Sequence, residues 1–295
     1  MKTGVLIAQL GTPDNASPDA VRRFLKEFLS DSHVIQVNPI LWFFILNFII
    51  LRTRPKKSAL LYERFFRLYG RTLMTYSQSL TRQLQPWAEK QDLVIDFGMR
   101  YGTPSLTRVL KNMVEKQGCE RIVVIPLFPQ FSDTTTGSIQ DLVYGYANSS
   151  EQKIKIEFLS DYHNHPLYIK SLASSIQSTL DKKDSPPDYI LLSYHGIPFK
   201  YATKGDVYPQ HCLKTTELLK RKLNFDDKKI LHMYQSRFGK EEWLKPYTDK
   251  PLIELAQQGA KNVVVCCPGF SMDCLETLDE IAVENHRLFI KRGGD

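Results

Sequence analysis

A histidine stands where an apolar run ends, in the segment LLSYHGIP (191–198). The apolar residues predict a buried strand, so His195 would lie at the carboxyl end of that strand and face a cleft. An imidazole in that position can accept a proton or ligate a metal ion near neutral pH. A lone histidine is more often structural, and the segment by itself leaves both interpretations open.

Three carboxylates follow a second apolar run. Glu276, Glu280 and Glu284 are spaced four residues apart, so on an α-helix they share one face. A solvated helix face tolerates the repulsion in such a row. If the row faces a cleft, each carboxylate raises the pKa of its neighbours, and the row could pass protons or a hard cation. Histidine with carboxylate also suits a divalent iron site, whereas the spacing is not that of an H-E-x-x-H zinc site.

Three further motifs carry polar or aromatic side chains past expected strand ends. The segment FPQFSDTTTG (128–137) begins a hydroxyl-rich loop, which could bind an anion through backbone amides or simply cap a helix. The segments YQSRFG (234–239) and WLKPYTD (243–249) place an arginine and a tryptophan after another strand. No RNP, KH or zinc-finger signature accompanies them, so we expect no nucleic-acid partner.

The elements that must position these residues alternate along the chain. Apolar runs rich in β-branched residues predict strands, and helix-period segments lie between most of them, one beginning at Ser17-Pro18. This alternation predicts the α/β class, with doubly wound parallel sheets covered by helices on both faces. The predicted strands are 4–10, 93–97, 121–127, 155–159, 189–193, 230–234 and 262–265.

The two halves of the chain resemble each other. VLIAQLGTP (5–13) aligns without gaps on ILLSYHGIP (190–198), and RYG (100–102) and the run 122–125 match RFG (237–239) and the run 263–266 in the same order. Ordered matches predict two similar halves, 1–150 and 151–295, with active residues at strand ends facing a shared cleft. Leu10 stands at the position that His195 has in the second half, so the fold itself does not require imidazole there.

The first half carries an insertion, about residues 32–70, that the second half lacks. It contains the apolar run ILWFFILNFIIL (40–51), followed by Arg52, Arg54, Lys56 and Lys57. A helix of that run spans only ~18 Å, too short for a hydrocarbon core of ~30 Å, so we expect no transmembrane segment. Two interpretations are equally open: a buried helix with solvated charges, or an apolar surface that enters an anionic headgroup layer.

Composition narrows the class of protein. Apolar residues make up 42% of the chain and charged residues 24%, which excludes a disordered chain. The formal net charge of +7 favours an anionic partner: nucleic acid, anionic lipid or a carboxylate-bearing small molecule. The five cysteines lack the spacing of a disulfide framework, so we expect reduced thiols in the cytoplasm. The amino terminus suits a first buried strand better than an export signal.

Taken together, these motifs resemble the ferrochelatase family over nearly the whole chain. The matching segments are LSYHGIP (192–198), YQSRFG, WLKPYTD, PGF (268–270), DCLETLDEI (273–281), LGTP (10–13), MRYG (99–102), PQFS (129–132) and TTG (135–137). The resemblance implies two similar Rossmann-like halves of the chelatase type, with a cleft between them. It also implies a lyase that inserts Fe²⁺ into protoporphyrin IX, the last step of haem biosynthesis.

The resemblance extends to individual residues. It implies that His195 and Glu276 face the porphyrin centre and contact iron, with His195 accepting a pyrrole proton and Glu280 extending the carboxylate row. Leu10 would pack on the opposite face of the ring, and the insertion would form an apolar lip that meets the membrane. Further substrate contacts are expected from Arg52, Arg54, Lys57, Arg100, Tyr101, Ser132, Ser236 and Trp243, the basic ones after the lip being candidates to pair with propionates.

Two departures from the family pattern refine these expectations. Cys274 replaces a second histidine, as in Gram-negative relatives, and Leu10 replaces the tyrosine of the coproporphyrin-using branch, which together imply protoporphyrin IX. The sequence ends at Asp295, so we expect it to lack the C-terminal tail and the cluster-binding cysteines of some relatives. We expect no iron–sulfur cluster or other permanently bound cofactor, and a monomer at the inner membrane surface. The alternatives are a cobalt or nickel tetrapyrrole chelatase and a non-catalytic porphyrin- or haem-binding paralogue.

Overall fold

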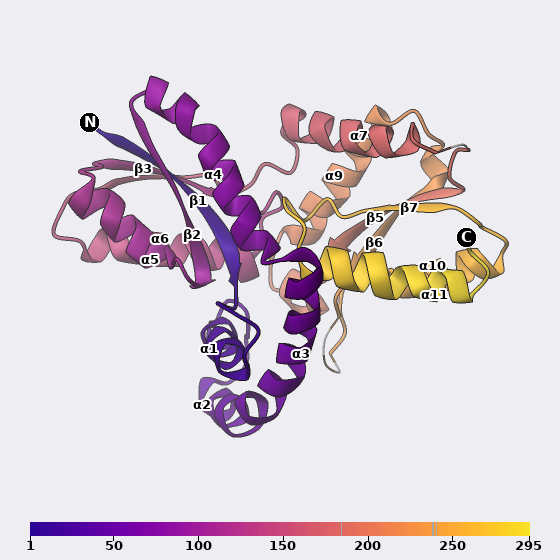
Figure 1. Cartoon of the computed structure of the whole chain (residues 1–295), viewed down its shortest axis with the longest axis horizontal. Coiled ribbons are helices and arrows are strands. Elements are labelled where there is room, and N and C mark those ends of the chain that lie inside the picture. The colour runs from indigo at the N-terminus through magenta and orange to yellow at the C-terminus, as the bar shows by residue number, and fades with distance from the viewer. Residues whose placement is uncertain (184, 238, 240) are drawn as a thin grey trace. The chain divides into compact units, whose positions relative to one another are not determined.

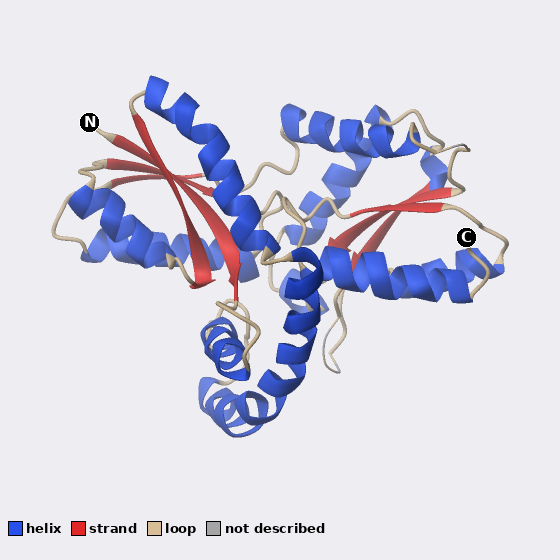
Figure 2. Ribbon diagram, viewed as in Figure 1, coloured by secondary structure: helices blue, strands red, loops and turns tan. Residues whose placement is uncertain are grey.

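The structure is a computed structural model that describes residues 1–183, 185–237, 239 and 241–295. The chain forms two compact units (Figure 1): unit 1 comprises 1–127 and 133–160, and unit 2 comprises 128–132 and 161–295. Each unit is a parallel β-sheet with helices packed against it (Figure 2). The predicted α/β class is confirmed.

Unit 1 contains a four-stranded sheet in the order β2-β1-β3-β4. Its strands are β1 (Thr3–Thr12), β2 (Leu93–Gly102), β3 (Arg121–Pro126) and β4 (Lys155–Phe158). Its helical elements are α1 (Pro18–Leu29), α2 (Pro39–Phe44), η1 (Ile45–Ile50), α3 (Leu51–Tyr69), α4 (Thr72–Lys90), α5 (Leu106–Lys111), η2 (Asn112–Lys116), η3 (Asp133–Gly137) and α6 (Ser138–Ser149). Strand β4 pairs with β3, so this sheet includes a strand that the sequence prediction, with its boundary at 150, assigns to the second half.

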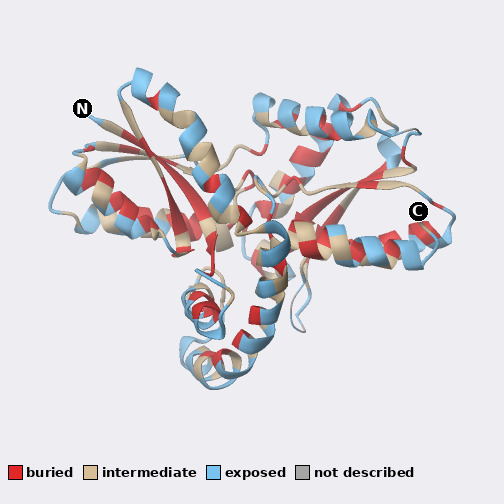
Figure 3. Ribbon diagram, in the orientation of Figure 1, coloured by how far each residue is buried: buried red, intermediate tan, exposed pale blue. Residues whose placement is uncertain are grey.

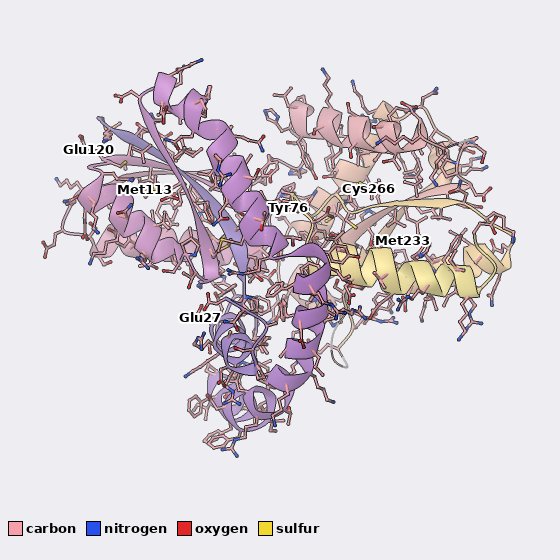
Figure 4. The ribbon with its side chains drawn as sticks, viewed as in Figure 1. Glu27, Tyr76, Met113, Glu120, Met233 and Cys266 are labelled. Atoms are coloured by element: carbon pink, nitrogen blue, oxygen red, sulfur yellow. The ribbon has the colours of Figure 1, made fainter. Side chains whose placement is uncertain are left out.

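Both faces of the first sheet are covered. Val5 and Ile7 of β1 pack with Ala88 of α4 on one face. On the other face Gly4 lies against Met113 of η2, whose terminal carbon would come within 2.5 Å of a Cβ at position 4 (Figure 4). Successive side chains of β1 therefore point alternately into two apolar layers, one on each face of the sheet. Buried residues are concentrated along the strands (Figure 3).

Unit 2 contains a three-stranded sheet in the order β6-β5-β7. Its strands are β5 (Tyr189–His195), β6 (Ile230–Gln235) and β7 (Val263–Cys266). Its helical elements are α7 (Pro166–Leu180), α8 (Phe199–Thr203), α9 (Tyr208–Lys222), η4 (Asp227–Lys229), α10 (Asp249–Gln257), η5 (Glu276–Asn285) and α11 (His286–Lys291).

The second sheet is also covered on both faces. Ile190 and Leu192 of β5 pack with residues of α7 and α9. Leu191, whose side chain points to the other face, packs with Met233 of β6 and with residues of α10 and α11 (Figure 4). Residues 190–192 of β5 form a continuous apolar run because side chains on both faces of the strand are buried.

The strand orders confirm the internal repeat. In each sheet the x-Gly-x-Pro strand, β1 or β5, lies between the second and third strands of its own half. The glycine of this motif approaches the neighbouring strand closely: a Cβ at Gly11 would lie 1.8 Å from the Tyr101 carbonyl oxygen, and one at Gly196 would lie 3.0 Å from that of Gln235. Phe238, part of a matched triplet, lies outside the described residues.

The insertion forms α2, η1 and α3. Only Leu46 and Leu51 of the apolar run 40–51 are buried, in a cluster with residues of α1. Large apolar side chains of the run remain exposed, at Ile40, Leu41, Phe43, Phe44, Phe48 and Ile49. The interpretation as a buried helix is therefore wrong within unit 1. Among the described residues no helix is both long and apolar enough to cross a membrane, as expected.

Replacing a core leucine should destabilise unit 2 far more than replacing a surface leucine. Leu192 is 0% exposed and Leu213 of α9 is 50% exposed. We expect Leu192→Ala to lower the free energy of unfolding by about 2–5 kcal/mol and Leu213→Ala to change it by less than about 0.5 kcal/mol. Calorimetric melting checks this, and equal shifts for the two variants would contradict the described packing.

Candidate functional site

His195 is the last residue of β5, and one hydrogen bond determines which of its nitrogens is available. Its Nδ1 lies 2.6 Å from the carbonyl oxygen of Gly196. Because a carbonyl oxygen can only accept, Nδ1 must carry the proton. The neutral ring therefore has an unprotonated Nε2, which can act as a proton acceptor or a metal ligand. The side chain is only half-buried.

Glu280 is held by the residue that follows β6. Its carboxylate accepts a hydrogen bond from the backbone N–H of Ser236 at 2.7 Å and a second from the Ser236 hydroxyl. Ser236 has a φ of 66°, in the left-handed region that non-glycine residues rarely adopt. This conformation turns both donors of one residue toward the same carboxylate, a local strain of the kind that clusters at functional sites.

The three predicted catalytic residues form one electrostatic group. Burial raises the pKa of Glu280, and the Glu276 charge adds to this increase, while the bonds from Ser236 and the interaction with His195 oppose it. Burial, and then the Glu276 charge, raise the pKa of the Cys274 thiol. His195 and Glu276 thus both act on the Glu280 carboxyl group in unit 2.

The carboxylate row lies on a wider helix than expected. Residues Glu276–Asn285 form a π-helix, in which hydrogen bonds join residues five apart. Glu276 and Glu280 are half-buried, whereas Glu284 is exposed. The row therefore leads from the partly enclosed site to the surface, although its spacing is not that of an α-helical face.

Gln235 is a residue that the sequence analysis did not identify. It pairs with His195 across β5 and β6, and its side chain is 4% exposed. Its amide nitrogen donates to the Glu276 carbonyl at 3.3 Å, and its amide oxygen accepts from the Ser193 hydroxyl at 2.7 Å. One buried amide therefore links β5, β6 and the start of η5. Its position in YQSRFG, beside a predicted strand end, was the available signal.

Trp243 lies next to the histidine turn. Residues Trp243 and Pro198 form an isolated antiparallel bridge, and a ring carbon of Trp243 would lie 3.3 Å from a Cβ at Gly196. Phe270, in the loop before η5, has its ring centroid 6.1 Å from that of His195. Aromatic rings thus border the site, which suits a flat apolar ligand.

Ser132 is the third predicted substrate contact in unit 2, after Ser236 and Trp243. It is 2% exposed, and its hydroxyl donates to Asp206 at 2.8 Å.

The remaining predicted contacts lie in unit 1. Tyr101 is 1% exposed, and its hydroxyl donates to Asp31 at 2.9 Å. The Arg100 guanidinium bonds to the same carboxylate and to the Ser138 hydroxyl. Asp31 is therefore a buried centre that already engages both side chains.

The other unit 1 candidates are more accessible. Leu10 is half-buried near the carboxyl end of β1. On α3, Arg52 and Lys57 are exposed and Arg54 is half-buried, with a pKa lowered by burial. The Arg52 guanidinium lies over the Phe48 ring, 5.2 Å from its centroid.

Comparison with known proteins finds relatives along the whole chain. A family model described as Ferrochelatase matches residues 2–295. A ferrochelatase of Vibrio cholerae serotype O1 is 46% identical over 297 residues, covering 100% of this chain and 90% of that protein. A ferrochelatase of Actinobacillus pleuropneumoniae serotype 3 is 45% identical over 295 residues, covering 99% of this chain and 90% of that protein.

The raised pKa of Glu280 predicts a pH-dependent stability. Because the folded protein binds this proton more tightly than the unfolded chain, the carboxyl group stabilises the fold at low pH, and this contribution is lost as the pH rises through the raised pKa. Glu280→Gln cannot ionise, so its melting temperature should exceed that of wild type at neutral pH, and the difference should shrink toward about pH 4. Glu284→Gln is the matched control. A Glu280→Gln difference that does not change with pH would contradict the assignment.

Proposed function

Because this chain belongs to the ferrochelatase family, we propose that it inserts Fe²⁺ into protoporphyrin IX, with His195, Glu276 and Glu280 performing the chemistry. The observation that carries this assignment is the group in unit 2: an imidazole with an unprotonated Nε2 beside two half-buried carboxylates. The reaction takes one Fe²⁺ and one porphyrin and releases two pyrrole protons, so the site needs both metal ligands and proton acceptors.

The Gly196 carbonyl restricts what His195 can do. Since Nδ1–H is already bonded, only Nε2 can reach a substrate, and a single lone pair cannot bind iron and a proton at once. His195 therefore contacts iron only until it accepts the first pyrrole proton. Glu276 then remains as the oxygen ligand that holds the ion during its transfer to the ring nitrogens.

The second pyrrole proton goes to the carboxylate row. A carboxyl group with a raised pKa holds a proton closer to neutral pH than an ordinary glutamate, which suits Glu280 as the next acceptor. Exposed Glu284 then passes the proton to solvent. In unit 1, Arg52, Arg54 and Lys57 stay as candidate partners for the porphyrin propionates.

Replacing His195 or Glu276 should slow metal insertion without abolishing porphyrin binding. We expect His195→Ala and Glu276→Gln each to lower the rate of Fe²⁺ or Zn²⁺ insertion by about 10²–10⁴-fold, because a positioned acid–base group is worth about that much. Porphyrin binding, followed by fluorescence quenching, should persist. His286→Ala, at an exposed histidine of α11, is the control.

Anaerobic absorption spectra of protein mixed with protoporphyrin IX and metal provide the measurement. Unchanged metalation by His195→Ala would refute the assignment. A wild-type protein that binds porphyrin without metalating it would instead support the carrier function.

The insertion supports a second part of the proposal, attachment to the cytoplasmic surface of the inner membrane. Its exposed apolar side chains include Ile40 at 72% and Phe44 at 54%, and exposed Arg52, Lys56 and Lys57 follow on α3. Apolar side chains with adjacent cations favour an anionic headgroup layer. The five cysteines are free thiols, as suits a reducing compartment.

Vesicle sedimentation tests the attachment. Phe44→Ser and Phe48→Ser should each weaken binding to phosphatidylglycerol-containing vesicles about tenfold or more, because burying a phenylalanine contributes about 1.5–3 kcal/mol. Leu167→Ser, at a residue of α7 that is 69% exposed, should bind like wild type. Equal losses in all three variants, or none, would rule out the insertion as the anchor.

A further inference from the structure

A second group of potential ligands in unit 2 uses none of the residues assigned to metalation. Asp161 and His163 lie in the loop before α7, and His211 lies on α9. One ligand atom from each lies within 4.8 Å of the other two. His163 Nδ1 is 2.6 Å from an Asp161 carboxylate oxygen, and the two imidazoles stack with centroids 3.7 Å apart.

A buried threonine fixes the backbones of both histidines. The Thr215 hydroxyl is 0% exposed and lies 2.9 Å from the His163 carbonyl oxygen and 3.0 Å from that of His211. The Gln130 amide donates to the same hydroxyl at 3.1 Å. The loop before α7 and helix α9 are thereby joined where the two rings meet.

One hydrogen bond identifies the unprotonated nitrogen of His211. The Phe131 N–H donates to His211 Nδ1 at 3.2 Å, so Nδ1 is unprotonated and its lone pair becomes available to an ion once this bond breaks. Two facing imidazoles repel each other when both are protonated, whereas both can share one cation beside the Asp161 carboxylate.

We propose that Asp161, His163 and His211 bind one divalent transition-metal ion, such as Zn²⁺, Co²⁺ or Fe²⁺, at a site distinct from the His195–Glu276 pair. Two imidazole nitrogens and one carboxylate oxygen are ligands that these ions favour. The lone pairs of parallel rings do not converge, so the stack opens when the ion binds. Nδ1 of His211 then leaves the Phe131 N–H, and the ring proton of His163 moves to Nε2.

Cobalt binding to the full-length protein tests the proposal. In a His195→Ala background, which weakens the metalation site, equilibrium dialysis without porphyrin should find one Co²⁺ per chain, with visible d–d absorption. Adding His211→Ala or Asp161→Asn should weaken this binding at least tenfold. Adding His165→Asn, at an exposed histidine of the same loop, should leave it unchanged.

A second measurement needs no substitution at the proposed ligands, so it remains valid if those variants fold poorly. In the same His195→Ala background, Zn²⁺ should raise the melting temperature and shift the ring ¹⁵N resonances of His163 and His211. Absence of Co²⁺ binding in that background, or equal losses with His165→Asn and His211→Ala, would overturn the proposal. Neither readout uses porphyrin metalation, so the result does not depend on the proposed function.

Discussion

The parallel pairing of β5 with β6 is the constraint on which the candidate site depends. Its register sets His195 opposite Gln235, so both strands end at the same edge of the sheet. The residue that follows each strand then orients a side chain of the site. The Gly196 carbonyl oxygen fixes the tautomer of His195, and the Ser236 N–H donates to the Glu280 carboxylate. Gln235 connects this edge to the start of η5. A slip of one residue would send these side chains to the wrong faces.

Placing Glu276 and Glu280 near each other in a half-buried site is electrostatically unfavourable, and this cost makes Glu280 a suitable proton acceptor. Two carboxylates approach each other in a half-buried site, and burial outweighs the two hydrogen bonds from Ser236, so the pKa of Glu280 rises. A glutamate that resists ionisation is unfavourable for folding at neutral pH, yet it is what a proton relay requires. Stability given up at such a position is the usual consequence of a site organised for function.

Much of the fold could be predicted because apolar runs and a repeated x-Gly-x-Pro motif encode buried strands directly. His195 became a candidate because it stands at a strand end and Glu276 because it begins a carboxylate row, but their pairing at a porphyrin centre was implied only by the resemblance to ferrochelatases. Gln235 could not be identified, since its role depends on a cross-strand register. The left-handed φ of Ser236 and the π-helix at Glu276 arise from tertiary packing, which local spacing does not report.

The insertion was ambiguous because the sequence of an apolar run is the same whether the run is buried or exposed. Strand β4 lies past the expected boundary because pairing with β3, not sequence distance, decides its sheet.

His195 presents an unprotonated Nε2 because the Gly196 carbonyl oxygen holds the proton on Nδ1. Long-range ¹H–¹⁵N NMR of the imidazole, at a pH where the ring is neutral, measures this tautomer directly. We predict a protonated Nδ1 and an unprotonated Nε2 on His195. A proton found on Nε2 would leave no lone pair facing the substrate and would contradict the mechanism.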